Sequence, residues 1–377
     1  MNSFLPARLA VKIIFFLNGF AHANYYSRLP RIQDQFQIDN GTLGVVLLSS
    51  SLGALLAMPF SGWMIIRNGS RRIGLFSVYM YCGLVPFITI SPNLISLLTV
   101  FFLLGVSSGM LDVAMNAQAV MIEQRWGKPI MTSFHAFFSV GMMLGALSGS
   151  LFSKMDTSLL THFVSITVVN LIVITVARFY LLHDKPETKA EGPAFRLPSA
   201  GLVGIGIVAF CSMLGEGAMA DWSTNYMENF AKASMSLAPI GLAAFAAAMT
   251  IGRIFGDRAR LKYGDKKLMI VCGLVSSAGL LISILFVTPA AVIAGFFIVG
   301  IGLSTIVPIA YSVAGNAKGI PSGVALAMVT TVGYAGFLFG PPIIGFLADF
   351  VTLRFALLLV LFLFLVMTAL GLRYKQV

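Results

Sequence analysis

The chain has 377 residues, of which 58% are hydrophobic and 10% charged, and its net charge is +11. Soluble domains carry about 25% charged residues, so this composition excludes an ordinary water-soluble protein. The apolar runs are continuous and do not alternate with polar residues, which also excludes a transmembrane β-barrel.

A membrane-crossing helix needs about 20 apolar residues, so a chain of this length accommodates about 12 spans with short connections. The sequence predicts an all-α membrane protein with twelve transmembrane helices, at residues 9–28, 42–66, 73–91, 94–121, 130–153, 157–182, 199–222, 237–256, 268–288, 291–315, 323–347 and 352–373. An alternative for the first segment is a signal peptide, because Ala21-His22-Ala23 follows an apolar run.

A polar segment divides the chain almost in half. Residues 183–198 are charged and contain proline, which predicts a linker between an N-terminal six-helix bundle, 1–182, and a C-terminal six-helix bundle, 199–377. Shifting the chain by 195 residues maps Gly69 onto Gly264 and Gly105 onto Gly300, together with several neighbouring residues. One constant offset over separate regions predicts a parallel repeat of the two halves.

The placement of basic residues predicts the topology. With a cytoplasmic N-terminus, all Lys and Arg fall on the cytoplasmic side except Arg28, Arg31, Lys154, Lys232 and Arg354. This is the positive-inside pattern of a multi-pass plasma or inner membrane protein with both termini cytoplasmic. The basic excess therefore indicates topology and contact with anionic lipid, and no nucleic-acid partner is expected.

Asp112 lies near the middle of the predicted span 94–121, with Asn116 one turn later. A carboxylate at the membrane centre costs about 2.5–3.5 kcal/mol, so we expect Asp112 to face an aqueous cavity or a partner. The alternative is an acid that pairs with a neighbouring helix for structural reasons.

The first span carries Asn18, His22 and Tyr26 on one helix face. We expect this stripe to face Asp112 and Asn116 across a central cavity, with His22 as a second titrating group. A neutral, hydrogen-bonded imidazole is the alternative for His22.

Four further polar or aromatic residues are candidate binding groups. His135 lies one or two turns inside the cytoplasmic end of the fifth span, where it is expected to bond to a neighbouring helix or to substrate. Glu216, Asp221 and Trp222 lie toward the outer end of the predicted seventh span and suggest a gate or a binding shelf. Trp222 also suits the interfacial aromatic belt.

Several motifs together carry a family resemblance: Asp112-Val-Ala-Met-Asn116-Ala-Gln118, Pro129-Ile-Met-Thr-Ser-Phe-His135, Glu216-Gly-Ala-Met-Ala-Asp221-Trp222, Gly252-Arg253-Ile-Phe-Gly256-Asp257-Arg258 and Gly333-Tyr334-Ala-Gly336-Phe-Leu-Phe-Gly340-Pro341-Pro342. Along its whole length the chain resembles the major facilitator superfamily, and within it the YbjJ-like bacterial permeases, which are distantly similar to fucose permease. The resemblance implies a bacterial inner membrane location and a sugar-binding, proton-coupling role for Asp112 and Asn116. Fucose permease also carries an acid near the first span, whereas this span has none.

The superfamily's gating loop between the second and third spans is altered in this chain. Ile66 occupies the position of the family's Asp, although the loop keeps Gly69, Arg71 and Arg72. The gating role is therefore expected to shift to the second half, where the candidates are Arg253, Asp257 and Arg258, with Asp257 paired to Arg253 or to a helix terminus. The alternative is an anchor loop that does not gate.

These features predict a secondary active transporter that moves a small, sugar-like polar solute by alternating access, coupled to protons. Tyr334 completes the candidate binding residues in the second half. The alternatives are an exporter of amphipathic compounds or drugs and a non-transporting membrane sensor. Enzyme motifs such as HExxH, GxSG and the Walker A sequence are absent, so no enzymatic activity, cofactor or metal is expected. The expected partners are the substrate, protons and the lipid bilayer, and the protein is expected to be a monomer.

Overall fold

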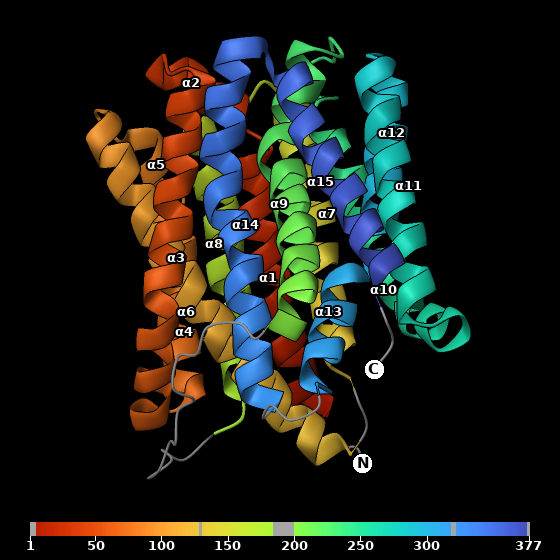
Figure 1. Ribbon diagram of the computed structural model, residues 1–377. Coiled ribbons are helices and arrows are strands. Elements are labelled where there is room, and N and C mark those ends of the chain that lie inside the picture. Colours follow the sequence, from red (N-terminus) through yellow and green to blue (C-terminus); the bar gives the residue numbers. More distant parts are fainter. Residues whose placement is uncertain (1–4, 128–129, 184–199, 318–321, 375–377) are drawn as a thin grey trace. The chain divides into compact units, whose positions relative to one another are not determined.

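A computed structural model describes residues 5–127, 130–183, 200–317 and 322–374, all of whose regular elements are helices. The helices group into two compact units (Figure 1). Unit 1 comprises Met1–Ile38 and Val46–Ala190, and unit 2 comprises Asp39–Val45 and Glu191–Val377. Residues 184–198 of the predicted linker lie outside the described residues, so the linker stays a prediction.

Unit 1 contains most of α3 and the whole of the other helices of the first half. Their bounds are α1 Leu5–Tyr26, α2 Leu29–Phe36, α3 Asn40–Asn68, α4 Ser70–Leu84, α5 Phe87–Ile90, α6 Leu94–Trp126, α7 Met131–Lys154, α8 Leu159–Ala177 and the 3₁₀ turn η2 Arg178–Tyr180. The short amphipathic α2 was not predicted by the span analysis, which searched for long apolar runs.

Unit 2 contains the helices of the second half. They are α9 Ala200–Asn229, α10 Pro239–Tyr263, α11 Asp265–Leu285, α12 Pro289–Leu303, α13 Ile306–Gly315, α14 Ser322–Val351 and α15 Leu353–Arg373. The first turn of α3 joins this unit, because the Asp349 carboxylate of α14 accepts hydrogen bonds from the backbone amides of Asn40 (3.0 Å) and Gly41 (2.6 Å). A carboxylate at this point satisfies amides that the helix itself leaves unpaired.

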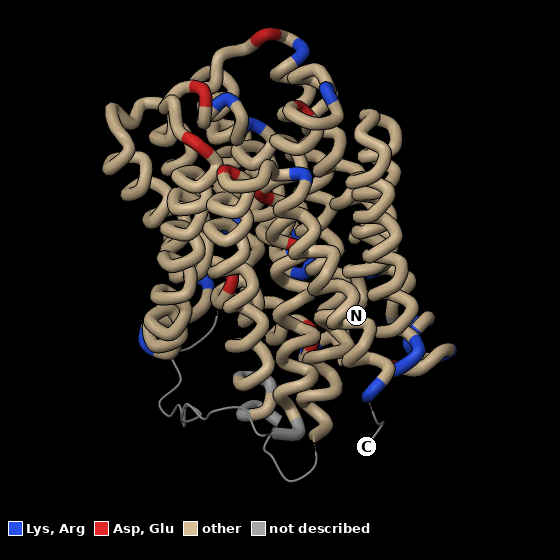
Figure 2. The backbone as a smooth tube through the Cα atoms, turned by 45° about the horizontal axis from the view of Figure 1, so that its top comes forward, with Lys and Arg blue, Asp and Glu red and all other residues tan. Residues whose placement is uncertain are grey.

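Ten helical segments of the described residues are long and apolar enough to cross a membrane. The first predicted span is the 22-residue α1, and the third is divided into α4 and α5, so the arrangement is consistent with the twelve predicted spans. Charged residues are few, and many of them lie toward the ends of the helices (Figure 2).

Two predicted spans are interrupted at prolines. A proline ring clashes with the carbonyl of the residue four positions earlier, so that carbonyl loses its helical partner. For Pro86 this carbonyl belongs to Cys82, and it instead accepts a hydrogen bond from Thr167 Oγ1 at 3.0 Å. For Pro308 it belongs to Ser304, the C-cap residue directly after the end of α12.

The 195-residue offset is visible in the structure. Gly69 and Gly264 both begin the second helix of a pair with positive φ angles, 83° and 77°. A Cβ atom on Gly105 of α6 would overlap the Ser50 carbonyl oxygen of α3, and a Cβ atom on Gly300 of α12 would overlap that of Phe245 on α10. Both residues of the second contact lie 195 positions after those of the first, so the two units repeat the same close helix packing.

Candidate functional site

Asp112 lies near the centre of the 33-residue helix α6. At a rise of 1.5 Å per residue it is about 27 Å from Leu94 and about 21 Å from Trp126. Asn116 Nδ2 donates to the Asp112 backbone oxygen at 2.8 Å and to Asp112 Oδ1 at 3.3 Å. Both side chains are half-buried. The structure therefore joins the predicted acid and amide into one polar pair at mid-helix.

Asn18 of α1 lies against the same part of α6. It is buried, and its Nδ2 is 3.7 Å from Sδ of Met115, the residue before Asn116. Asn18 Oδ1 is also buried and accepts no hydrogen bond within the described part of the chain. A buried amide oxygen without a donor favours a bound polar group or water at this position.

His22 lies in an aromatic cluster, which we define as His22, Tyr25, Tyr26, Tyr81 and Phe138. Its ring centroid is 4.9 Å from that of Tyr81 on α4, and its Nδ1 is 3.0 Å from the backbone oxygen of Asn18. These contacts join His22 to aromatic rings and to its own helix, and none of them joins it to Asp112. The predicted stripe on α1 therefore divides into an amide next to α6 and an imidazole among tyrosines.

His135 is the fifth residue of α7 and its ring packs edge-on against Phe15 of α1, with centroids 5.2 Å apart. Phe15 precedes Asn18 by one turn of α1. Helices α1, α6 and α7 thus bring Asn18, Asp112, Asn116 and His135 to one part of unit 1.

The second-half candidates differ from the prediction in position. Helix α9 continues to Asn229, so Glu216, Asp221 and Trp222 lie in the body of the helix rather than toward its end. Trp222 is 0% exposed and Asp221 is 4% exposed, so Trp222 is not an interfacial belt residue. The span analysis ended the helix at its first polar cluster, whereas protein packing buries this cluster inside unit 2.

Unit 2 contains an ion pair that the sequence analysis did not name. Arg253 Nη2 of α10 is 3.1 Å from Glu216 Oε1 of α9, and their side chains are only 14% and 16% exposed. The contact between α9 and α10 could not be read from the pattern along one helix. The side chain of Asp257 lies outside the described residues, so its pairing with Arg253 or with a helix terminus stays a prediction.

Tyr334 of α14 lies close to the Asp221 region through Phe337. The rings of Tyr334 and Phe337 have centroids 6.0 Å apart. A Cβ atom built on Gly217 would be 3.0 Å from Phe337 and 3.9 Å from Asp221 Oδ2. Tyr334 and Asp221 therefore belong to one neighbourhood of α9 and α14.

The predicted gating residues of unit 1 hold the chain that follows α8. Arg71 Nη2 donates to the Arg178 carbonyl at 2.9 Å, and Arg71 also contacts His183. Gln118 Nε2 donates to Ser70 Oγ at 2.8 Å and to the Leu182 carbonyl at 3.0 Å, while Gln118 Oε1 accepts from the Leu182 amide at 3.1 Å. Arg72 and Arg258 are exposed. In the structure Arg71 and Gln118 form an anchor, and the sequence analysis assigned no such role to Gln118.

Two further polar clusters were missed by the sequence analysis. In unit 2, Arg260 binds both carboxylate oxygens of Asp265, at 2.5 and 3.1 Å, and donates to Ser312 Oγ at 2.7 Å. The signal available for this clamp was an acid directly after Gly264. Burial, followed by the nearby Asp265 charge, raises the pKa of Tyr374 above its ordinary value, so Tyr374 lies near this clamp.

The other missed cluster joins α1, α7 and α8 in unit 1. His162 Nε2 is 2.8 Å from Asn24 Oδ1, and both residues are fully buried. Arg28, 6% exposed, donates to Ser153 Oγ at 2.5 Å and to the Thr157 carbonyl at 3.1 Å. A lone histidine in an apolar span was the only sequence signal.

The chain matches known proteins along nearly its whole length. The family model of the Major Facilitator Superfamily matches residues 12–203 and 205–376. An uncharacterised MFS-type transporter of Yersinia pestis is 34% identical over 352 residues, covering 93% of this chain and 91% of that protein. Membrane protein MosC of Rhizobium meliloti is 32% identical over 356 residues, covering 93% of this chain and 86% of that protein.

Solved structures share the fold at low sequence identity. The nucleoside transporter NupG superposes with a TM-score of 0.77 at 13% identity, covering 100% of this chain and 100% of that chain. A bacterial homologue of the lysosomal transporter Spinster, inward-facing and unoccupied, superposes with a TM-score of 0.75 at 13% identity, covering 96% of this chain and 95% of that one. The chain therefore belongs to the Major Facilitator Superfamily and is a multi-pass membrane transporter of that type.

Proposed function

We propose that this transporter is a proton-coupled secondary transporter that moves a small polar solute by alternating access, with Asp112 as the coupling acid. The observation that carries the proposal is the mid-helix carboxylate of Asp112 with its amide neighbour Asn116. An ionisable group at this depth costs free energy, so a functional role is the default interpretation.

The surroundings of Asp112 support solute binding in unit 1. Asn18 presents a buried acceptor oxygen beside α6, and His135 lies against the same stretch of α1. A few convergent polar groups on otherwise apolar helices are typical of a small-molecule site. We propose Asn18, Asp112, Asn116 and His135 as contacts of the solute.

The comparison of the two units supports a single coupling acid. The 195-residue offset places Val307 at the position of Asp112 and Tyr311 at that of Asn116. The charged residue Glu216 in unit 2 already has an arginine partner. Asp112 has no equivalent carboxylate in the second half, so we assign proton coupling to the first.

The relatives support a small solute but not a particular one. A 4-hydroxybenzoate transporter of Pseudomonas putida is 25% identical over 246 residues, and the NupG structure is that of a nucleoside transporter. The resemblance of the sequence motifs to fucose permease adds sugars to the candidate solutes. We therefore propose a solute of this size with hydroxyl groups, carried in the bacterial inner membrane by a monomer with both termini cytoplasmic.

The experiment uses purified protein in proteoliposomes that enclose a pH-sensitive dye. A panel of sugars, sugar acids, nucleosides and hydroxybenzoates is added outside, and a transported compound is detected by proton movement. Asp112→Asn should abolish proton movement and uphill accumulation while keeping solute exchange, and Asp112→Glu, which keeps a carboxylate, should retain some of both. Unchanged proton movement in Asp112→Asn would refute the coupling role.

Export of amphipathic compounds is the second candidate, and the aromatic cluster around His22 favours it. Aromatic rings bind planar or cationic apolar compounds through stacking and cation–π contacts. Adding lipophilic cations to the same panel separates the candidates. Transport of these cations alone would favour export over polar-solute uptake.

A further inference from the structure

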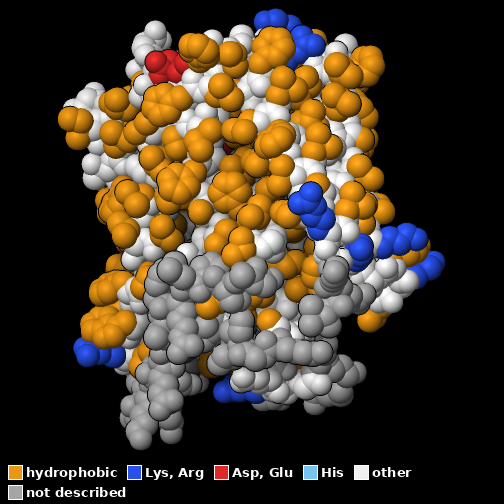
Figure 3. Space-filling model, in the orientation of Figure 1, with side chains coloured by type: hydrophobic (Ala, Val, Ile, Leu, Met, Phe, Trp, Pro, Cys, Tyr) orange, Lys and Arg blue, Asp and Glu red, His pale blue; other side chains and the backbone are white. Residues whose placement is uncertain are grey.

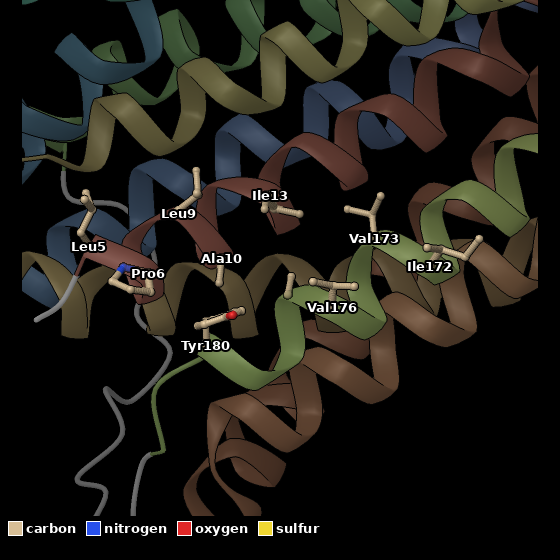
Figure 4. Close-up of a pocket in the computed structure, with 10 residues that line it drawn as sticks. Leu5, Pro6, Leu9, Ala10, Ile13, Ile172, Val173, Val176 and Tyr180 are labelled. Atoms are coloured by element: carbon tan, nitrogen blue, oxygen red, sulfur yellow. The ribbon is translucent and has the colours of Figure 1, made fainter.

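Unit 1 contains an apolar groove between α1 and the end of α8 (Figure 4). Its volume is about 630 Å³. The groove is lined on the α1 side by Leu5, Pro6, Leu9, Ala10 and Ile13, and on the α8 side by Ile172, Val173, Val176, Ala177 and Tyr180. Tyr180 contributes the only side-chain polar atom among these residues.

Several of the lining residues are exposed on the surface of unit 1. Leu9 is 53% exposed, Ile172 60% and Val176 59%, which is high for large apolar side chains. Apolar side chains also cover most of the helix surface visible in Figure 3. In a membrane transporter such surfaces contact lipid tails, so a groove in them accommodates an acyl chain.

One end of the groove lies where both helices terminate. Pro6 is the second residue of α1, and Tyr180 is the last residue of the turn that follows α8. Tyrosine is enriched at the level of the lipid headgroups, so this end is expected to lie at the membrane interface.

The two helices that form the groove carry cations and no acids. Arg8, Lys12 and Arg178 each stand next to a lining residue, whereas residues 5–26 and 159–180 contain no Asp or Glu. Each cation lies over an aromatic ring, at 4.7 Å for Arg8 over Trp126, 4.5 Å for Lys12 over Phe137 and 4.8 Å for Arg178 over Phe179. In the described part of the chain, no carboxylate pairs with any of the three. Arg8 and Lys12 thus lie over rings of α6 and α7, whereas Arg178 lies over its own neighbour, two residues before the lining residue Tyr180, where its charge complements an anionic headgroup.

We propose that this groove is a binding site for an anionic phospholipid. One acyl chain lies between α1 and α8, and the phosphate lies at the end marked by Pro6 and Tyr180, where basic side chains of the same helices attract it. Lipid binding at this groove does not rest on the proposed transport function.

The test is native mass spectrometry of the purified, full-length protein titrated with phosphatidylglycerol or phosphatidylethanolamine of identical acyl chains. Phosphatidylglycerol should be retained at least about fivefold more strongly, the ratio that corresponds to one basic residue near an anionic surface. Val173→Trp fills the groove and should reduce retention about tenfold. Val169→Trp, on the same helix and 54% exposed but outside the groove, should leave it unchanged.

The headgroup contact is tested separately. Arg178→Gln should lower the preference for phosphatidylglycerol about fivefold. Arg67→Gln is the control, because Arg67 is an exposed arginine of unit 1 that, like Arg178, lies over an aromatic ring, at 4.2 Å from the centre of Trp63. Equal retention of the two lipids by the unaltered protein, or unchanged retention in Val173→Trp, would overturn the proposal.

Discussion

Asp112 and Glu216 both lie in the body of membrane helices, and their surroundings differ. Asp112 receives an amide hydrogen bond from Asn116, while Glu216 pairs with Arg253. Both arrangements lower the cost of a carboxylate in an apolar medium. The ion pair compensates the Glu216 charge within the protein, whereas the hydrogen bond from Asn116 is made by a neutral amide. The two carboxylates are therefore stabilised in different ways.

The ion pair between Glu216 and Arg253 predicts that removing one partner lowers the stability of the protein strongly. Arg253→Met should destabilise the protein by about 3–5 kcal/mol, because Glu216 is left as a buried, uncompensated charge. Adding Glu216→Gln to that variant should restore much of the lost stability. Unfolding in detergent measures the stability of the single and the double variant, with Arg258→Met as an exposed control. A double variant no more stable than Arg253→Met alone would show that the unpaired Glu216 charge does not cause the destabilisation.

Gln118 predicts a local effect at the end of unit 1. Gln118→Leu removes the partners of the Leu182 amide and carbonyl and should cost about 1–3 kcal/mol. Hydrogen exchange should show the Leu182 amide losing protection. Gln124→Leu, on the exposed face of the same helix, should change neither quantity. Retained protection in Gln118→Leu would contradict the anchor.

At the level of elements, glycines set how closely helices pack. Gly105 and Gly300 let α6 approach α3, and α12 approach α10, at positions related by the 195-residue offset. Close backbone approach through small residues is a common basis of helix association in membranes. Gly105, two turns before Asp112 on α6, therefore has a packing role.

Equivalent glycines should respond equally to substitution. Gly105→Ala and Gly300→Ala should each lower the thermal midpoint by several degrees, because the added methyl group overlaps a backbone carbonyl. Gly83→Ala, where no atom lies within 4 Å, should be neutral or stabilising by up to about 1 kcal/mol. If Gly105→Ala left the thermal midpoint unchanged while Gly300→Ala lowered it, the two units would not share this packing.

At the level of the whole molecule, the chain is two copies of one helical arrangement with different polar residues. Gly69 before α4 and Gly264 before α11 both have a positive φ angle. The coupling candidate Asp112 nevertheless lies in unit 1, and the Arg253–Glu216 ion pair lies in unit 2. Shared packing with divergent polar groups allows one fold to give each half a distinct role.

The charge distribution predicts the orientation of the whole chain. On a background in which Cys82, Cys211 and Cys272 are replaced, Gln37→Cys should react with an impermeant thiol reagent added to intact cells. Arg72→Cys should react only after permeabilisation, since loops rich in Arg and Lys remain in the cytoplasm. The opposite labelling pattern would reverse the proposed topology.

The sequence by itself determined the fold class. Continuous apolar runs require helices in a membrane, because the backbone must satisfy its own hydrogen bonds there. The prediction of a major facilitator permease is confirmed by the family match. The sequence also located Gly69 and Gly264 as equivalent turns, because a glycine between two helices keeps its meaning without knowledge of its neighbours.

The tertiary structure alone decided which polar groups meet. Hydropathy ended α9 too early, because buried polar residues such as Asp221 look like a helix end until the surrounding helices are known. The partner of Arg253, the anchor made by Gln118 and the groove between α1 and α8 all depend on contacts between segments far apart in the chain. Such contacts are set by packing between helices, and a pattern along one helix does not contain them.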